Sequence, residues 1–257
     1  MDASTRRILV INGKGGCGKT TIATNLSVAY ASAGFSVALV DNDPQASSTY
    51  WGEVRSESLP PVRLVPAHQR THMYQTQTFQ HRLPADAQRV IVDGHSNARD
   101  RDLEALLKQA DVVLVPLLPS SIDIRAGGQF ITTLLTHRAF RNSPRPVGVI
   151  ANRVQPNTET HAKLEHFLGC LDVPAVATFR DSPVYTEAVE VGKGVVDMID
   201  SRAARKETPA WRNLIKWIDA QPKASPTTVD DLRRRPAAST LRDTEQPTTL
   251  DERSLSA

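Results

Sequence analysis

Cysteines and long apolar runs are scarce in this sequence of 257 residues. The two cysteines, Cys17 and Cys170, are too few for the disulfide framework of a small secreted domain or for a cysteine-ligated metal cluster. Residues 1–7 lack the apolar core of a signal peptide, and no apolar run approaches the ~20 residues that span a bilayer. We therefore expect a cytoplasmic protein that makes no membrane contact.

Aromatic side chains are also scarce, at 5% of the residues. The core is therefore expected to consist mainly of Val, Leu, Ile and Ala. The hydrophobic content of 40% and the charged content of 23% are ordinary for a globular protein. The net charge of +3 is compatible with a polyanionic partner, but it is too small to indicate one unless the basic residues cluster.

A glycine-rich segment lies between an apolar run at 8–11 and an amphipathic pattern at 20–33, and it fits the phosphate-binding loop G-x-x-x-x-G-K-[ST]. Glycines let backbone N–H groups point at phosphate oxygens, and the following helix adds partial positive charge. The pattern predicts that Lys19 reaches the β- and γ-phosphates of ATP and that the Thr20 hydroxyl binds Mg²⁺. The expected phosphate-binding residues are Gly13, Lys14, Gly15, Gly16, Cys17, Gly18, Lys19, Thr20 and Thr21.

Short β-branched runs alternate with helical patterns along the chain. Strands are predicted at 8–11, 36–40, 62–65, 89–93, 112–116, 147–151 and 175–179. Helices are predicted at 20–33, 101–109, 124–136, 161–168, 184–191 and 209–218, with a loosely packed helical region at 67–83. Strands connected through helices imply parallel pairing. We therefore expect an α/β fold of three layers, with a mostly parallel sheet between helices on both faces.

The composition changes near residue 221, where Pro, Ser, Thr and charges of both signs begin to dominate. Such a segment buries too little apolar surface to offset the entropy lost on folding. We expect one ATPase domain at 1–220 and a disordered C-terminal tail at 221–257.

Three acidic residues follow apolar strands: Asp41, Asp43 and Asp93. In an open parallel sheet, ligands bind at the carboxyl ends of the strands. Asp93 follows Val-Ile-Val, which is the Walker B pattern, and we assign it to the shell of a Mg²⁺ ion. Any one of these residues could instead be an ordinary loop or cap residue. All three together, after a phosphate loop, favour a site that hydrolyses Mg·ATP.

Lys14 lies near the start of the phosphate loop, and residues 41–45 read Asp-Asn-Asp-Pro-Gln. Together with Leu-Pro-Ser-Ser-Ile-Asp at 118–123, these motifs resemble the ParA/MinD family of deviant Walker A P-loop ATPases, and the resemblance extends over nearly all of residues 5–219. It implies an ATP-bound homodimer in which Lys14 crosses the interface to the nucleotide of the other subunit. It also implies that Asp41 supports Mg²⁺ and that Asp43 positions the hydrolytic water. A solvated loop lysine is the alternative for Lys14.

The chain departs from that family after the Walker B residue. The family often has a small residue and Pro there, whereas this chain has Gly94, His95 and Ser96. His95 could approach the γ-phosphate or simply face solvent. The resemblance further implies that Asn152 lies against adenine and that Arg153 helps to cover the base, although Asn at a strand end is also an ordinary turn residue.

The resemblance implies a ParA-type ATPase that positions a cargo. Its ATP-bound dimer would bind DNA non-specifically and associate with the nucleoid. The cargo would be a plasmid, a chromosome or a protein organelle such as the carboxysome, and an adaptor protein on it (ParB-like or McdB-like) would stimulate hydrolysis. DNA binding depends on neutralised phosphates, and the candidate residues are Arg180, Lys193, Arg202, Arg205, Lys206, Arg212 and Lys216.

Two other functions are found on the same fold. A membrane-recruited regulator similar to MinD needs a C-terminal amphipathic helix, and the tail has no such pattern. A metabolic enzyme would be an ATP-dependent ligase or an iron–sulfur reductase. The reductase needs a pair of suitably placed cysteines, for which Cys17 and Cys170 look unsuitable, and the ligase needs a small-molecule pocket that the sequence does not identify.

Overall fold

The computed structural model describes residues 5–67, 83–96 and 100–223. Within them, one seven-stranded sheet has the order β3-β2-β4-β1-β5-β6-β7, and all of its pairings are parallel. The strands are β1 (Arg6–Val10), β2 (Val37–Asp41), β3 (Val62–Pro66), β4 (Arg89–Asp93), β5 (Val112–Leu117), β6 (Val147–Val154) and β7 (Ala175–Arg180).

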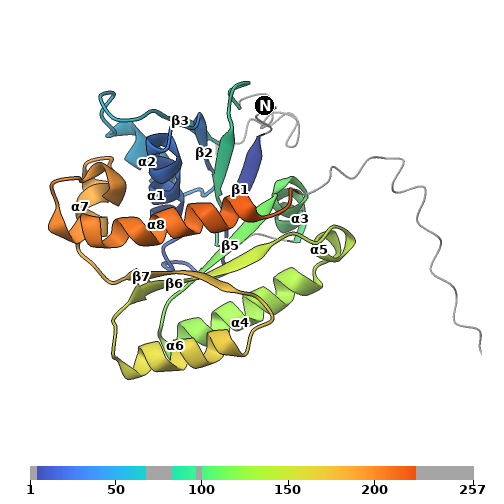
Figure 1. Cartoon of the computed structure of the whole chain (residues 1–257). Helices are drawn as coiled ribbons and strands as arrows, with labels where there is room; N and C mark the ends of the chain where they lie inside the picture. The colour runs from blue at the N-terminus through green and yellow to red at the C-terminus, as the bar shows by residue number, and fades with distance from the viewer. Residues whose placement is uncertain (1–4, 68–82, 97–99, 224–257) are drawn as a thin grey trace, which may run out of the picture. The chain divides into compact units, whose positions relative to one another are not determined.

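Helices cover both faces of this sheet (Figure 1). One face carries α1 (Lys19–Ser32), α2 (Ser47–Glu53), α7 (Val184–Glu190), the 3₁₀ helix η2 (Val195–Asp197) and α8 (Arg202–Ala220). The other face carries α3 (Asp100–Gln109), α4 (Ser121–Thr136), α5 (Arg138–Asn142) and α6 (Glu159–Gly169). The predicted three-layer α/β fold is therefore confirmed.

The core divides into two apolar clusters, one on each face of the sheet. Strand β5 is buried along its whole length, and its side chains alternate between the clusters. A strand that is covered on both sides needs apolar residues in both directions, which explains its unbroken apolar run. On the α8 side, Phe179 stacks on Trp211 with ring centroids 4.0 Å apart, which joins β7 to the last helix.

The structure corrects several predicted boundaries. The last helix begins at Arg202, and not at Pro209, because Ser201 caps it and the helix continues through the exposed Pro209. Strand β6 extends to Val154, so Asn152 and Arg153 belong to the strand itself. The short helices α5 and η2 were not predicted.

Two predicted segments fall largely outside the described residues. These are the helical region at 67–83, of which residues 68–82 are not described, and the tail, of which residues 224–257 are not described. None of the helices in the described ranges is both long and apolar enough to cross a membrane.

Candidate functional site

The glycine-rich loop connects the end of β1 to the start of α1. Gly16 and Gly18 have φ angles of 76° and 92°, in the left-handed region that favours glycine. A Cβ atom on Gly18 would lie only 2.2 Å from Asn152 Nδ2, so no side chain fits at this position. The loop therefore has the close-packed turn and the adjoining helix N-terminus that a phosphate-binding loop requires.

Asn152 is buried, and its amide donates a hydrogen bond of 2.9 Å to the carbonyl of Cys17. Asn152 thus holds the glycine-rich loop from β6. Its predicted contact with adenine stays a prediction. Arg153 has a φ of 53° and points to the surface, where its Nε lies 3.1 Å from Asp181. Asn152 is therefore buried and Arg153 lies at the surface, although both were expected to contact the base.

Lys19 lies at the first position of α1 with only 6% of its surface exposed. Its ammonium donates to the carbonyl of Lys14 and to the hydroxyl of Ser96, both at 3.3 Å. Within the described residues, no carboxylate lies within ion-pair distance of it. A buried cation with only neutral acceptors is suited to bind an anion, as the loop pattern predicts.

Asp41 and Asp93 lie side by side, because they are register partners at the carboxyl ends of the neighbouring strands β2 and β4. Both are fully buried. One oxygen of Asp93, Oδ2, accepts hydrogen bonds of 2.7 Å from Thr20 and from Ser48. The other, Oδ1, is buried and has no hydrogen-bond partner within the described residues.

Burial raises the pKa of Asp93 to about 6, and the nearby Asp41 adds to this, although the hydrogen bonds from Ser48 and Thr20 oppose it. A buried oxygen without a donor is costly unless a ligand completes it. Mg²⁺ prefers oxygen ligands and usually takes only one or two carboxylates, together with phosphate oxygens and water. Asp93 Oδ1 beside the Thr20 hydroxyl fits that ion.

Asp41 is engaged differently. Its Oδ2 accepts from both the backbone N–H and the hydroxyl of Thr49, each at 2.7 Å, and its Oδ1 accepts from the N–H of Asp43 at 3.1 Å. These hydrogen bonds fix the turn that leads into α2 and hold the backbone of Asp43 next to Asp41. Asp43 is partly exposed, and its carboxylate accepts from the N–H of Gln45 at 2.9 Å.

Lys14 is partly exposed and forms an ion pair with Asp123 in the first turn of α4. Its backbone N–H donates to the side chain of Asn12 at 3.1 Å, and Asn12 in turn donates to the carbonyl of Pro116 at 2.8 Å. The early lysine is therefore held by its own chain in this structure, at the rim of the loop.

The basic candidates on α8 gather on one face. At about 100° per residue, five of them lie within about 120° of arc, opposite the buried positions of the helix. Between Arg202 and Lys216, that arc contains no acidic residue. The five residues, called the α8 basic face below, are Arg202, Arg205, Lys206, Arg212 and Lys216.

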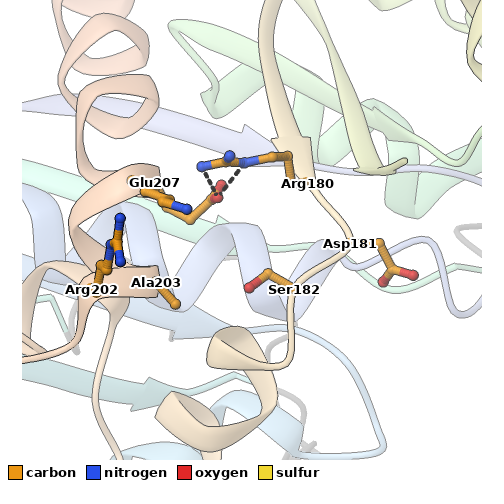
Figure 2. Close-up of a pocket in the computed structure, with 7 residues that line it drawn as sticks. Arg180, Asp181, Ser182, Arg202, Ala203 and Glu207 are labelled. Atoms are coloured by element: carbon orange, nitrogen blue, oxygen red, sulfur yellow. Dashed lines mark hydrogen bonds and ion pairs between the residues drawn. The ribbon is translucent and has the colours of Figure 1, made fainter. Parts of the chain in front are cut away.

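The other two candidates are placed elsewhere. Arg180 forms an ion pair of 2.7 Å with Glu207, and both line a hollow together with Arg202 (Figure 2). Lys206 lines the same hollow. Lys193 lies in the turn between α7 and η2, where its carbonyl accepts from the Trp51 indole at 3.1 Å.

Sequence reasoning missed two serines in this site. Ser48 contacts Asp93, and Ser96 contacts Lys19, across 45 and 77 residues of sequence respectively. Ser48 carried a weak signal, because it lies in the first turn after Asp-Pro-Gln. Ser96 lies in the segment that departs from the family pattern, and no feature of the sequence sets it apart from its neighbour His95.

Known proteins resemble this chain in sequence and in fold. Residues 8–183 match the CobQ/CobB/MinD/ParA nucleotide binding domain. The chain is 33% identical over 216 residues to the maintenance of carboxysome distribution protein A of Gloeobacter kilaueensis, covering 83% of this chain and 94% of that protein. It is 30% identical over 192 residues to the protein of the same name from Halothiobacillus neapolitanus, covering 74% of this chain and 87% of that protein.

A solved structure shares the fold at lower sequence identity. The septum site-determining protein MinD of Pyrococcus horikoshii, complexed with Mg-ADP, superposes with a TM-score of 0.66 at 21% identity. The match covers 84% of this chain and 96% of that chain.

Proposed function

Because the chain belongs to the CobQ/CobB/MinD/ParA family of nucleotide-binding domains, we propose that it is a ParA-type ATPase that forms an ATP-dependent dimer and positions a cargo on DNA. The observation that carries the proposal is that one site contains both a buried Lys19 with only neutral acceptors and a buried carboxylate oxygen of Asp93 without a donor in the described residues. In a glycine turn that bound no ligand, both buried groups would cost stability without compensation.

Each residue has a role in hydrolysis. Lys19 binds the β- and γ-phosphate oxygens, and the loop N–H groups hold the phosphate chain. Asp93 and Thr20 would hold Mg²⁺, which would supply positive charge beside the phosphates. Asp41 holds the turn that carries Asp43, and the partly exposed carboxylate of Asp43 orients the attacking water.

The early lysine supplies the dimer switch. The Lys14 side chain is 36% exposed, and ion pairs that remain open to solvent contribute only about 1 kcal/mol, so Lys14 could exchange Asp123 for another anion. Phosphate of a second subunit would offer it a stronger anionic partner. ATP thereby joins two subunits, and loss of the γ-phosphate releases them.

DNA binding is assigned to the α8 basic face. Its exposed cations would contact backbone phosphates and not base edges, so binding would be non-specific and salt-dependent. The protein would therefore associate with the nucleoid. The two carboxysome-distribution relatives favour a protein organelle as cargo, with an adaptor protein on that cargo stimulating hydrolysis.

The test compares Lys14→Ala with Lys19→Ala. Lys14→Ala should bind nucleotide as the wild type does but stay monomeric with ATP in light-scattering chromatography, and it should not be retained on duplex DNA at low salt. Lys19→Ala should fail at nucleotide binding itself. Normal dimerisation and DNA retention by Lys14→Ala with ATP would refute the dimer switch, and DNA binding by the wild type that ignores ATP or salt would refute the DNA assignment.

A further inference from the structure

The segment after the Walker B carboxylate is held tightly against β1. The N–H of Gly94 donates to the carbonyl of Val10 at 2.9 Å. A Cβ on Gly94 would lie 3.0 Å from that same carbonyl and 3.3 Å from Ile11, so a larger residue would push the segment away. This close approach brings the chain over the phosphate loop, which starts just beyond β1.

Ser96 is the residue that this approach presents to the loop. Its Oγ lies 3.3 Å from the ammonium of Lys19. The same Oγ lies 3.7 Å from the position that a Cβ on Gly15 would occupy, so the hydroxyl also lies against the glycine side of the loop. Ser96 thus reaches Lys19 from the segment that follows β4, at the point where the lysine is expected to meet phosphate.

A hydroxyl can accept one hydrogen bond and donate another. Without an anion, Ser96 accepts from Lys19. When a phosphate oxygen takes the ammonium, the hydroxyl can donate to the same phosphate group while it still accepts from the lysine. The loop N–H groups surround the α- and β-phosphates, so a donor that reaches Lys19 from outside the loop meets the γ-phosphate.

We propose that Ser96 is a γ-phosphate contact through which the site distinguishes ATP from ADP. The inference rests on the proposed function, because it requires the loop to bind a nucleoside triphosphate. We assign the γ-phosphate contact to this hydroxyl, and not to the His95 imidazole, because Ser96 Oγ lies 3.3 Å from the Lys19 ammonium.

The experiment measures the affinity of the full chain, with Mg²⁺, for ADP and for a non-hydrolysable ATP analogue. Protein concentrations are kept below those at which the protein self-associates, so that dimerisation does not add to the signal. Ser96→Ala should bind the analogue about tenfold more weakly, the scale of one hydrogen bond to a charged group, and should bind ADP as the wild type does. Ser96→Thr, which keeps the hydroxyl, should restore discrimination, and His95→Ala should match the wild type.

Ser96→Cys provides a second variant of similar size with a weak donor, and it should behave as Ser96→Ala does. Equal loss of both nucleotides in these variants would mean a structural role and would overturn the inference. Unchanged affinity for both would overturn it as well, while leaving the ATPase proposal intact. If the wild type itself binds neither nucleotide, the proposed function fails, and this inference fails with it.

Discussion

Lys19 and Lys206 are both expected to meet phosphate, but they stand in opposite surroundings. Lys19 is buried at the start of α1, where its ammonium donates to the Lys14 carbonyl and to the Ser96 hydroxyl. Lys206 is exposed on α8, in a row of similar cations. The first region places one charge in one position, whereas the second spreads several charges along a surface.

This difference determines how each region responds to change. A buried cation with fixed partners contributes strongly to one ligand, and no neighbour can replace it. Exposed cations contribute little each, add to one another, and are screened by salt. Single substitutions should therefore abolish nucleotide binding but only weaken DNA binding.

The largest effect is expected for Lys19→Ala. Loss of charge-assisted hydrogen bonds to two phosphates should weaken nucleotide affinity by roughly 100-fold or more, measured by titration calorimetry. Lys206→Ala, its counterpart on α8, should leave nucleotide affinity within about twofold. Similar losses of nucleotide affinity in the two variants would show that the two lysines do not differ as described.

The next effect concerns pH and Asp93. Its folded pKa of about 6 lies above the ordinary 3.8, so the protonated form stabilises the fold at low pH. That stabilisation is lost as the pH rises from about 4 to about 6, by up to roughly 3 kcal/mol. Thermal unfolding in EDTA should show this loss in the wild type but not in Asp93→Asn. The same dependence of stability on pH in both proteins would contradict a raised pKa at Asp93.

The same carboxyl should make metal binding depend on pH. Mg²⁺ needs the ionised form, so the Mg²⁺ concentration that supports nucleotide binding should rise as the pH falls below about 6. Asp93→Asn should need more Mg²⁺ at every pH and show no such change. A wild-type requirement that is constant between pH 5 and 7 would exclude Asp93 as the ligand.

Ser48→Ala tests the positioning of Asp93. Removing one donor from Oδ2 leaves the carboxylate held by Thr20 alone, and we expect Mg²⁺-dependent nucleotide binding to weaken by about tenfold. Ser47→Ala, at the exposed neighbouring position, is the matched control. Nucleotide affinity without Mg²⁺ should be the same in both variants, and a loss there would point to misfolding of α2.

The smallest effects are expected on the α8 basic face. Arg202→Ala should weaken ATP-dependent DNA binding only a few-fold and reduce the slope of log affinity against log salt by about 1. Arg141→Ala, at an exposed position on the opposite face of the sheet, should change neither quantity. A salt slope that is unchanged by all five α8 substitutions would place the DNA elsewhere.

Local patterns predicted the glycine-rich turn between β1 and α1 and the strand that ends at Asp93, because each depends on residues within about a dozen positions. The three-layer class followed from the alternation of strands and helices along the chain. Local patterns failed at α8, where Pro209 suggested a helix start and concealed the first turns that carry Arg202 and Lys206. They also gave no sign that the Asn152 amide donates to the Cys17 carbonyl.

The sequence by itself determined that a phosphate loop follows a buried strand and that acidic residues end the neighbouring strands. Only the tertiary structure decided which groups meet: Ser48 with Asp93, Ser96 with Lys19, and Lys14 with Asp123. The physical reason is that these pairs are joined through the strand order β2-β4-β1-β5 and its register. Lys14, Lys19 and Thr20 lie close together in the sequence, but their partners lie on α4 (Asp123), in the segment after β4 (Ser96) and on β4 itself (Asp93).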